Sequence, residues 1–497
     1  MVEEQNEHRL VQERMRKREA LLENGVNPYP YRYGKTHDAA QVQEAHKGLE
    51  PEATTEQEVV VAGRIMALRV MGKASFCTIQ DATGRIQLYV RKDELGDEQY
   101  KRFKKLDIGD IIGADGTVFA TKTGEVTVRA KSLELLAKSL RPLPEKYHGL
   151  QDTELRYRQR YLDLIMNPEV RETFIKRSKI IKSIRQTLDG NGFLEVETPT
   201  LQPVYGGANA RPFVTHHNAL DMRLYLRISN ELYLKRLLVG GFERVYEFVK
   251  DFRNEGIDRT HNPEFTQVEW YQAYGDYNDG MRLVEDAVSK AAQDVLGTTK
   301  ITFDGKEIDL KPPWRRMTVA AVVNEHTGLD IDSMSREDLL DYCDKEGIEY
   351  DASSWGMLVV AIFEGKCEDK LIQPTFVRDY PVENTPLAKA RRDGDDRYVE
   401  QFEVYINGWE MGNAYSELND PVVQRRLLEE QAERGRGGDE EAHPMDEDFL
   451  ASLEHGMPPT SGVGLGIDRF VMLFTGNDSI RDVILFPTMR PQKDEGL

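Results

Sequence analysis

The sequence of 497 residues has little cysteine and no long apolar segment. Its three cysteines, Cys77, Cys343 and Cys367, lie far apart and form no CxxC pair. This spacing argues against disulfides and structural zinc, and it indicates a reducing compartment, the cytoplasm. No run reaches the roughly 18 apolar residues of a membrane-spanning helix, and the charged N-terminus lacks the apolar core of a secretory signal. We therefore expect no membrane association.

The usual nucleotide-binding motifs are also missing. The chain has neither G-x-x-x-x-G-K-[ST] nor a strand followed by G-x-G-x-x-G, and the glycine-rich "SGVGLGIDRF" of residues 461–470 lacks the lysine of a phosphate-binding loop. Its glycines could equally allow a strand and a helix to pack closely. The net charge of -20 argues against a generic nucleic-acid binder. A nucleotide would have to be held by arginine and aromatic side chains.

The arrangement of short runs predicts more than one domain. Five β-rich runs between Val59 and Leu136 alternate with Gly-Asp turns, which favours a small closed barrel of the OB type, although a β-sandwich fits the pattern equally well. Later strands and helices mix without βαβ alternation, so we expect an α+β domain around an antiparallel sheet. The predicted parts are a helical arm and linker over 1–58, the barrel over 59–140, a linker over 141–165, and the α+β domain over 166–497 with a helical insertion over 312–370.

Three further segments have their own predictions. The N-terminal helix, Glu3 to Leu22, is expected to be a solvated arm, with a contact to nucleic acid as the alternative. A long helix should run from Pro168 to Asn191 and lead into a strand at "FLEVETP". The polar residues 430–447 predict a mobile loop.

The stretch "FRNEGIDRTHNPEFT", Phe252 to Thr266, combines charge with aromatic rings. The planar guanidinium of Arg253 suits a phosphate, and Phe265 could stack on a purine. His261 and Asn262 could reach further phosphate oxygens. The alternative is a polar hairpin loop held by surface ion pairs.

A second cluster lies in "QFEVYINGWEMGNAYSELND", residues 401–420. Asn407-Gly408 between alternating apolar residues predicts a hairpin with a two-residue type I′ turn. Pairing outward from this turn sets Tyr405 opposite Glu410 and places Glu403 diagonal to Glu410, roughly 7–8 Å away on the same face. Two such carboxylates could share a magnesium ion with phosphate oxygens. The alternative is a solvated face.

Three more acidic residues, Glu231, Glu269 and Glu417, stand near Tyr271 and Tyr415 in the sequence motifs. Together they would suit a cationic ligand, through charge and through cation–π attraction. Taken singly, each could be an exposed or helix-capping acid.

Several long motifs resemble those of the class II aminoacyl-tRNA synthetases. "FRNEGIDRTHNPEFTQVEWYQAY" is similar to motif 2, "GVGLGIDRFVMLF" to motif 3, and the helix with "GFLEVETP" to motif 1. The class I signatures HIGH and KMSKS are absent. Within class II the chain most resembles the bacterial type of the lysyl-tRNA synthetase family, from about residue 55 to 491.

The resemblance implies an OB-fold anticodon-binding domain and a class II catalytic domain. It implies a cytoplasmic homodimer, joined through motif 1, that activates L-lysine with ATP and transfers it to the 3′ end of tRNA(Lys), releasing AMP and pyrophosphate. For ATP it implies Arg253 on the α-phosphate, Glu255 at the adenine amino group, Phe265 on the ring, His261 and Asn262 in support, Arg469 on the γ-phosphate, and Glu403 and Glu410 as Mg²⁺ ligands.

The resemblance also assigns the amino-acid pocket and the anticodon site. Glu417 would meet the substrate's ε-ammonium, and Glu231 and Glu269 its α-ammonium. Asn230 departs from the family, which usually has proline before the glutamate. The remaining implied contacts are Gly207, Tyr271, Asn413 and Tyr415 for lysine, and Arg69, Phe76, Gln87 and Glu125 for anticodon bases.

Two alternatives share much of this pattern. An aspartyl- or asparaginyl-tRNA synthetase has the same layout, but its pocket should contain a basic residue where this chain gathers glutamates. A catalytically dead RNA-binding paralogue would have no reason to keep Arg253, Glu403, Glu410 and Arg469.

Overall fold

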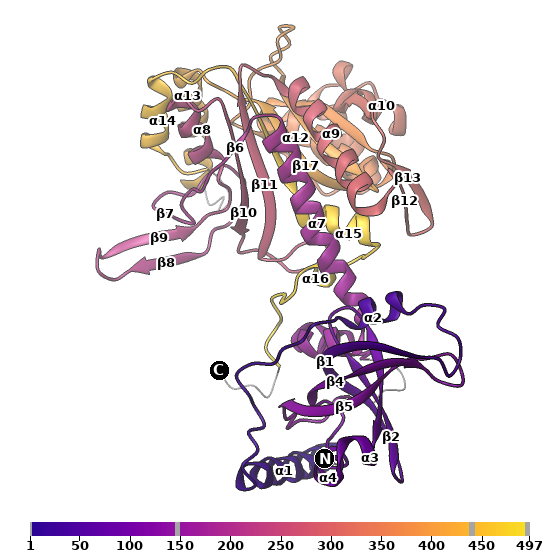
Figure 1. Ribbon diagram of the computed structural model, residues 1–497. Helices are drawn as coiled ribbons and strands as arrows, with labels where there is room; N and C mark the ends of the chain where they lie inside the picture. Colours follow the sequence, from indigo (N-terminus) through magenta and orange to yellow (C-terminus); the bar gives the residue numbers. More distant parts are fainter. Residues whose placement is uncertain (1, 145–149, 437–442, 493–497) are drawn as a thin grey trace. The chain divides into compact units, whose positions relative to one another are not determined.

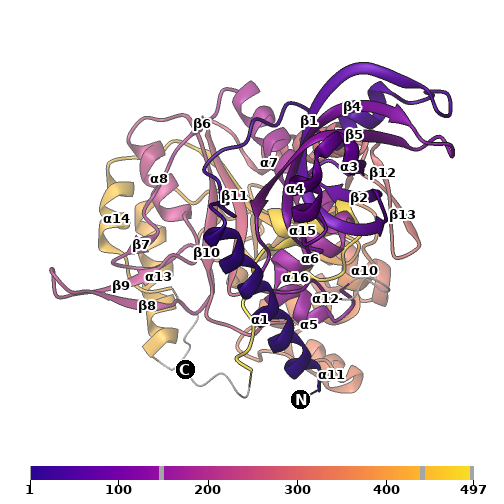
Figure 2. The ribbon, with the colours of Figure 1, turned by 60° about the horizontal axis from the view of Figure 1, so that its bottom comes forward.

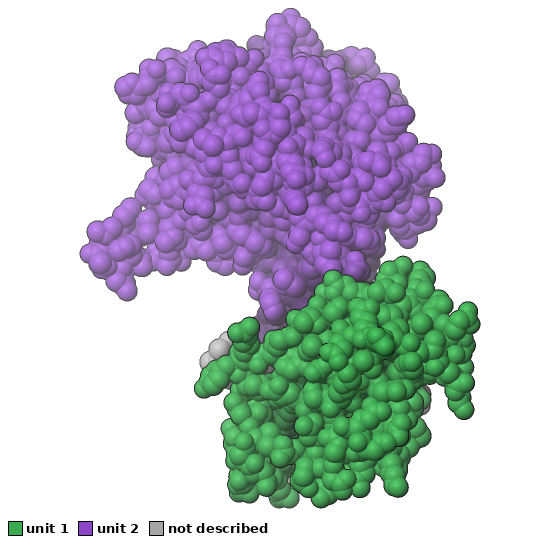
Figure 3. All heavy atoms as spheres, in the orientation of Figure 1, with its two compact units in different colours: residues 1–149 green, residues 150–497 purple. Residues whose placement is uncertain are grey.

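The computed structural model describes residues 2–144, 150–436 and 443–492. The chain divides into two compact units, residues 1–149 and residues 150–497 (Figure 3). Within the described ranges, no helix combines the length and the apolar character needed to cross a membrane. Each unit has its own hydrophobic core.

The first unit is built on a closed barrel of five strands in the order β1-β2-β3-β5-β4 (Figure 1). Closure confirms the OB-type barrel and excludes the sandwich. Alternate residues such as Val59, Val61 and Ile65 are buried inside, as the two-residue period of a strand requires. The elements are β1 (Thr54–Met71), β2 (Ala74–Gln80), β3 (Arg85–Arg91), β4 (Ile111–Ala120), β5 (Val126–Ala137), α2 (Ala39–Ala45), α3 (Lys92–Leu95) and α4 (Asp97–Phe103).

The N-terminal helix α1 (Val2–Glu23) is docked on the barrel, so the expectation of a solvated arm is wrong for one of its faces. Arg14 is only 8% exposed. Its guanidinium donates to the carbonyls of Ile108 and Arg141, each at 3.0 Å. Lys17 adds an ion pair with Asp107 at 2.7 Å. A buried arginine with backbone acceptors fixes the helix more firmly than surface charges could.

The second unit is an α+β domain around an eight-stranded sheet, in the order β14-β15-β16-β17-β18-β11-β10-β6. All neighbouring strands are antiparallel except β14 with β15 and β10 with β6. The strands are β6 (Leu194–Glu195), β10 (Arg244–Phe252), β11 (Glu264–Ala273), β14 (Arg315–Thr318), β15 (Thr375–Pro381), β16 (Tyr398–Ile406), β17 (Trp409–Ser416) and β18 (Thr460–Gly466).

Helices cover one face of this sheet (Figures 1 and 2). Ile184 of α7, Val284 of α9 and Val471 of α15 meet Val268 and Trp270 of β11 in one buried core. On the opposite face, Tyr271 and Ala273 at one end of β11 pack against α8 and α14, and the rest of the strand presents polar side chains such as Gln267 and Glu269. The helices of this unit are α5 (Thr153–Arg158), α6 (Arg160–Met166), α7 (Pro168–Gly190), α8 (Glu231–Val239), α9 (Tyr277–Leu296), α13 (Pro421–Arg436), α14 (Glu447–Glu454), α15 (Ile467–Thr475) and α16 (Ile480–Val483).

Three helices between β14 and β15 form a smaller core of their own. Val322, Leu339 and Phe363 pack together there and against Val377 and Tyr405 of the main sheet. The helices are α10 (Val319–Thr327), α11 (Arg336–Glu346) and α12 (Trp355–Lys366), and the small sheets of the unit are β12 (Lys300–Phe303) with β13 (Lys306–Asp309), and β7 (Leu201–Gln202) with β9 (Met222–Leu226) and β8 (Val214–His217).

Two predictions of local structure need correction. The polar loop expected over 430–447 is helical as far as Arg436, because α13 continues into it; its residues 437–442 lie outside the described part of the chain. The strand expected at "FLEVETP" pairs through only two residues, Leu194 and Glu195. Pro199 ends the run and cannot donate to a ladder, so the segment stays short at the sheet edge.

Arg160 makes a buried polar centre where α6 meets the C-terminal segment. Its side chain is fully buried and forms an ion pair with Asp163 at 2.6 Å. It also donates to the carbonyls of Arg481 at 2.8 Å and Leu485 at 3.1 Å.

We expect Arg160→Met to lower the free energy of unfolding of the second unit by about 3–5 kcal/mol, because it removes the donor to Oδ2 of the buried Asp163 carboxylate and to the carbonyls of Arg481 and Leu485. Urea unfolding followed by fluorescence measures this. The matched control is Arg282→Met, which removes an exposed ion pair with Asp279 and should cost less than about 1 kcal/mol. Equal losses in the two variants would contradict the assignment.

Candidate active site

A cavity of about 480 Å³ opens on the polar face of the large sheet. Its walls come from β11, β16, β17 and β18, from the start of α8 and from the loop between β10 and β11. The structure brings together every residue that the sequence nominated in this unit. These are Gly207, Glu231, Arg253, Glu255, His261, Asn262, Phe265, Glu269, Tyr271, Glu403, Glu410, Asn413, Tyr415, Glu417 and Arg469.

Strand β11 supplies one wall through its two-residue period. Phe265, Gln267, Glu269 and Tyr271 line the cavity, whereas Trp270 belongs to the core on the other face. Sequence reasoning missed Gln267, although the alternation with its neighbours was the signal that could have found it.

Arg253 and Phe265 form one end of the cavity. The guanidinium carbon of Arg253 lies 5.1 Å from the centroid of the Phe265 ring. Among the described residues, no hydrogen-bond acceptor meets the buried Nε of Arg253. A buried guanidinium donor without an acceptor favours an anionic ligand, since leaving the donor unpaired is costly.

The loop between β10 and β11 is fixed by its own hydrogen bonds. Asp258 lies 2.8 Å from Nδ1 of His261 and accepts the backbone N–H groups of Thr260 and His261, each at 2.7 Å. Burial opposes ionisation of Asp258, but these donors outweigh it and lower its pKa to about 2. The loop therefore presents its histidine in a set position at neutral pH.

Arg469, at the start of α15, joins this end of the cavity. Its guanidinium donates to the backbone carbonyl of Glu410 and lies 3.6 Å from the Glu410 carboxylate. It also lies 3.3 Å from Nε2 of His261. Motif 3 thus supplies a cation that touches both the hairpin and the loop after β10.

The hairpin of β16 and β17 confirms the predicted turn and the pairings next to it, but its register shifts farther from the turn. Asn407 and Gly408 have φ of 60° and 72°, as a type I′ turn requires. Tyr405 pairs with Glu410 as predicted, but a bulge follows, and Glu403 pairs with Asn413. Glu403 still lies two residues along β16 from the partner of Glu410, but the bulge places one extra residue between them on β17.

The residue beyond the bulge explains the shift. A side chain at Gly412 would place its Cβ 2.1 Å from the carbonyl oxygen of Gly464 on β18. Strand β17 can approach β18 this closely only because residue 412 is glycine. The extra residue of the bulge, Met411, is accommodated next to Gly412. Glu403 and Glu410 nevertheless both line the cavity.

Carboxylates gather around this hairpin. Burial and the charge of Glu410 raise the pKa of Glu403 to about 8. Burial and the same neighbour also raise the pKa of Glu364, which the sequence did not nominate. Carboxylates that destabilise one another in this way suit a divalent cation. In the described ranges no three metal-ligand side chains surround a common position, so a cation held by Glu403 and Glu410 would need ligand oxygens as well.

The opposite end of the cavity is acidic. Glu269 accepts hydrogen bonds from Gln267 at 2.7 Å, Ser229 at 3.1 Å and Tyr271 at 3.2 Å. Burial, followed by the charges of Asp251 and Glu231, raises its pKa well above the ordinary value. A cationic ligand would restore its ionised form.

Glu231 and Glu417 share a lysine that the sequence did not nominate. Nζ of Lys235 lies 2.6 Å from Oε1 of Glu231 and 2.5 Å from Oε2 of Glu417. The i,i+4 spacing of Glu231 and Lys235 on α8 was visible in the sequence. Their meeting with Glu417, at the far end of β17, was not.

Asn230, which replaces the usual proline, has a structural role. It precedes α8, is fully buried, and donates from Nδ2 to Oε2 of Glu247 at 2.8 Å. Proline could not make this bond. Asn230 therefore connects the start of α8 to β10, and its presence in place of proline removes no site residue.

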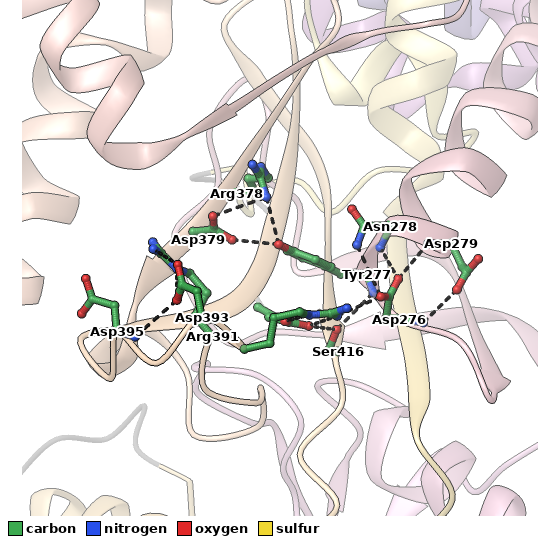
Figure 4. A network of polar contacts seen from close by, with 12 residues as sticks. Asp276, Tyr277, Asn278, Asp279, Arg378, Asp379, Arg391, Asp393, Asp395 and Ser416 are labelled. Atoms are coloured by element: carbon green, nitrogen blue, oxygen red, sulfur yellow. Dashed lines mark hydrogen bonds and ion pairs between the residues drawn. The ribbon is translucent and has the colours of Figure 1, made fainter.

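A polar network supports the end of β17 from behind the cavity (Figure 4). Ser416 donates to Glu400 at 2.5 Å and accepts the backbone N–H of Tyr277 at 3.1 Å. Arg392 connects the same glutamate, at 2.7 Å, with Asp276 at 2.8 Å. The residue after Ser416 is a cavity carboxylate, so the network fixes the strand that carries it.

The barrel of the first unit has a separate aromatic face. Phe76 lies 5.0 Å from Tyr89, and Tyr89 lies 5.7 Å from Phe119, between ring centroids. Arg129 covers Phe119 at 4.9 Å. The sequence did not nominate Tyr89, Phe119 or Arg129, because each is an ordinary alternating strand residue.

The nominated barrel residues surround this face. Arg69 pairs with Phe76 across β1 and β2. Gln87 donates to Glu125 at 2.9 Å. Half-buried rings flanked by polar side chains suit the stacking of unpaired bases.

Comparisons with known proteins match both units of the chain. Residues 152–490 match the family described as "tRNA synthetases class II (D, K and N)", and residues 59–136 match the "OB-fold nucleic acid binding domain". A lysine–tRNA ligase of Pelotomaculum thermopropionicum is 55% identical over 494 residues, covering 99% of this chain and 96% of its own length. Those of Carboxydothermus hydrogenoformans and Clostridium botulinum strain Langeland are 54% and 52% identical, covering 99% and 98% of this chain and 100% and 97% of their own lengths.

The glycines of β18 give a stability test of the cavity. A Cβ at Gly462 would lie 2.0 Å from Oε1 of Glu417 and 2.3 Å from the Tyr271 ring, whereas a Cβ at Gly464 would meet nothing closer than 3.6 Å. We expect Gly462→Ala to lower the free energy of unfolding by about 1–3 kcal/mol through overpacking. Gly464→Ala should change it by less than about 0.5 kcal/mol. Urea unfolding of both variants measures the difference, and similar losses would refute the close approach.

Proposed function

The chain belongs to the class II tRNA synthetases of the D, K and N group, and we propose that it is specific for lysine. It activates L-lysine with ATP and transfers the lysyl group to the 3′ end of tRNA(Lys), releasing AMP and pyrophosphate. The observation that carries this proposal is the cavity with arginines at one end and buried carboxylates at the other. ATP is anionic, and lysine carries two ammonium groups.

The arginine end holds ATP. Arg253 contacts the α-phosphate, and its Nε gains the acceptor it lacks among the protein's described residues. Phe265 stacks on the adenine, and Glu255 accepts from the adenine amino group. Arg469 contacts the γ-phosphate. His261 and Asn262 support the outer phosphates and the base from the loop after β10.

Glu403 and Glu410 would hold magnesium together with phosphate oxygens. Their shared cavity wall and the raised pKa of Glu403 fit a divalent cation, whose positive charge favours both carboxylates in ionised form. When bound, such an ion neutralises charge on the pyrophosphate as it leaves.

The carboxylate end holds lysine. Glu417 meets the ε-ammonium, while Glu231 and Glu269 meet the α-ammonium, and burial strengthens each ion pair by excluding water. This places the substrate carboxylate toward Arg253 and the α-phosphate. The remaining contacts of the pocket are Gly207, Tyr271, Asn413 and Tyr415.

Activation needs no nucleophile from the protein. A carboxylate oxygen of lysine attacks the α-phosphorus, the new P–O bond forms, and the bond to pyrophosphate breaks. Arg253 stabilises the negative charge of the crowded phosphate, and the two ends of the cavity align the reactants. A terminal ribose hydroxyl of the tRNA then attacks the lysyl carbonyl carbon, and AMP leaves.

The barrel, residues 59–140, reads the anticodon. Phe76 stacks on a base, and Arg69, Gln87 and Glu125 contact base edges. Catalysis belongs to residues 166–497, and the cytoplasm is where the reaction takes place.

The protein acts as a homodimer joined through α7 and β6. Apolar side chains on this side are exposed: Ile175 by 39%, Leu194 by 49% and Phe486 by 70%. Several large apolar side chains left exposed near one another are typical of a surface that a partner covers.

Amino-acid-dependent exchange of pyrophosphate into ATP tests the central proposal. With magnesium and no tRNA, we expect exchange with lysine alone among the twenty amino acids, because three buried carboxylates repel acidic substrates. Exchange with aspartate or asparagine would refute the lysine pocket. No exchange with any amino acid, from folded protein, would favour an inactive RNA-binding relative.

Phe76→Ala tests the barrel separately. Losing one stacked base costs about 1–3 kcal/mol, so KM for tRNA(Lys) should rise roughly 5- to 150-fold while pyrophosphate exchange is unchanged. Tyr31→Ala is the control, since Tyr31 is a fully exposed aromatic of the same unit outside the ring cluster. Unchanged aminoacylation by Phe76→Ala would remove this residue from the anticodon site.

A further inference from the structure

We propose that Lys235 sets the charge of the amino-acid pocket and thereby determines its fit to a substrate with two ammonium groups. The inference rests on the proposed lysine specificity. Lys235 touches neither the cavity nor the reacting atoms, so it acts as a positioning residue through the two glutamates that it binds.

The geometry places one ammonium group between two pocket carboxylates. The Lys235 side chain is fully buried, and Glu231 and Glu417 approach its Nζ from different elements, α8 and the end of β17. Besides this ion pair, the Glu417 carboxylate is approached by the backbone N–H of Gly462. It is held by Lys235 and still has capacity for a second cation.

The charges of the pocket add up to the complement of lysine. When all three are ionised, as a bound cation favours, Glu231, Glu269 and Glu417 contribute three negative charges and Lys235 one positive charge, which leaves two negative charges. L-Lysine brings two ammonium groups, while its carboxylate faces Arg253 and the phosphates. Without Lys235 the pocket would contain one buried negative charge more than the substrate can neutralise.

A purely structural ion pair would not need this arrangement. One buried ammonium is satisfied by one carboxylate, and apolar residues of the same volume often stabilise a fold as well or better. Two carboxylates on one lysine leave an excess negative charge in a dry site, which is unfavourable until another cation arrives. The triad is therefore incomplete in the empty pocket and complete with substrate.

The titratable groups around Lys235 leave it charged. Although burial lowers the pKa of Lys235, attraction to Glu231 and Glu417 outweighs it and raises the pKa. Burial and Lys235 lower the pKa of His443 to about 4, so this neighbour is neutral at pH 7.

The remaining neighbours behave differently. Burial raises the pKa of Tyr271 and of Tyr415 well above the ordinary value, so both stay neutral. Burial also raises the pKa of Glu231 and of Glu417, and the ammonium of Lys235 opposes this rise.

The test is Lys235→Met, measured as KM for lysine and for ATP in pyrophosphate exchange from pH 6.5 to 9. Removing the ammonium raises the pKa of Glu231 and Glu417 further, so lysine must compete with a proton for the pocket. We expect KM for lysine to rise at least tenfold at pH 7, and its ratio to wild type to fall at least fivefold by pH 9. Because both enzymes are measured at the same pH, the ratio removes the effect of the titration of lysine itself. KM for ATP should stay within twofold of wild type.

Two further variants separate charge from structure. Lys235→Met combined with Glu231→Gln restores two negative charges and removes a neighbour that raises the pKa of Glu417, so the pH dependence of the ratio should be weaker than in Lys235→Met even though one substrate contact is lost. If Lys235→Met alone fails to fold, this double variant can be measured in its place. Lys290→Met is the matched control, because Lys290 forms an exposed i,i+4 ion pair with Asp294 at 2.5 Å, and it should behave as wild type.

The outcomes distinguish this inference from the proposed function. Suppose wild type exchanges with lysine, but the ratio of KM for lysine between Lys235→Met and wild type does not change with pH. Lys235 is then only structural and the inference is overturned. A parallel rise of KM for lysine and KM for ATP in Lys235→Met would overturn it as well. If wild type itself shows no exchange with lysine, the proposed function fails. A pH-dependent ratio that is weaker in the double variant supports the charge-setting role.

Discussion

The two-residue period of the central strands is the constraint on which the site depends. One set of side chains packs against α7, α9 and α15, and the alternate set faces the cavity. Any slip of one residue would exchange the two sets, burying carboxylates in the apolar core. The interior contacts of Trp270 and Val268 therefore position Glu269 and Tyr271 as surely as their own hydrogen bonds do. Core packing and substrate recognition are specified by the same register.

Charge is separated along the cavity because the two ends are built from different parts of the sheet. The loop after β10 and the start of α15 supply arginines, whereas β11, the end of β17 and the start of α8 supply carboxylates. Each end attracts the opposite part of the reactants, so binding and alignment come from the same interactions. The protein positions the reactants and neutralises their charges. The bonds that form and break are bonds of the substrates.

The sequence predicted the elements and the gathering of site residues better than their local geometry. Long motifs and strong periodicity located the barrel, α7 and the hairpin turn at Asn407. The bulge after Glu410 could not be predicted, because it depends on how closely Gly412 must approach Gly464 on another strand. Lys235 was not predicted for a similar reason, since its second partner, Glu417, is far away in the sequence. Contacts between distant segments are decided by tertiary packing, which no local pattern contains.

The contact of Arg469 with Glu410 has a consequence for the empty enzyme. The Arg469 side chain is already held at the cavity by the backbone carbonyl of Glu410 and lies beside the Glu410 carboxylate. A long arginine ordinarily loses rotamer freedom when it binds a phosphate, at a cost of roughly 0.5–1.5 kcal/mol. In this protein, the arginine side chain already loses its rotamer freedom when the chain folds. In the proposed ATP site, nucleotide binding would exchange one partner of Arg469 for another without having to order the arginine.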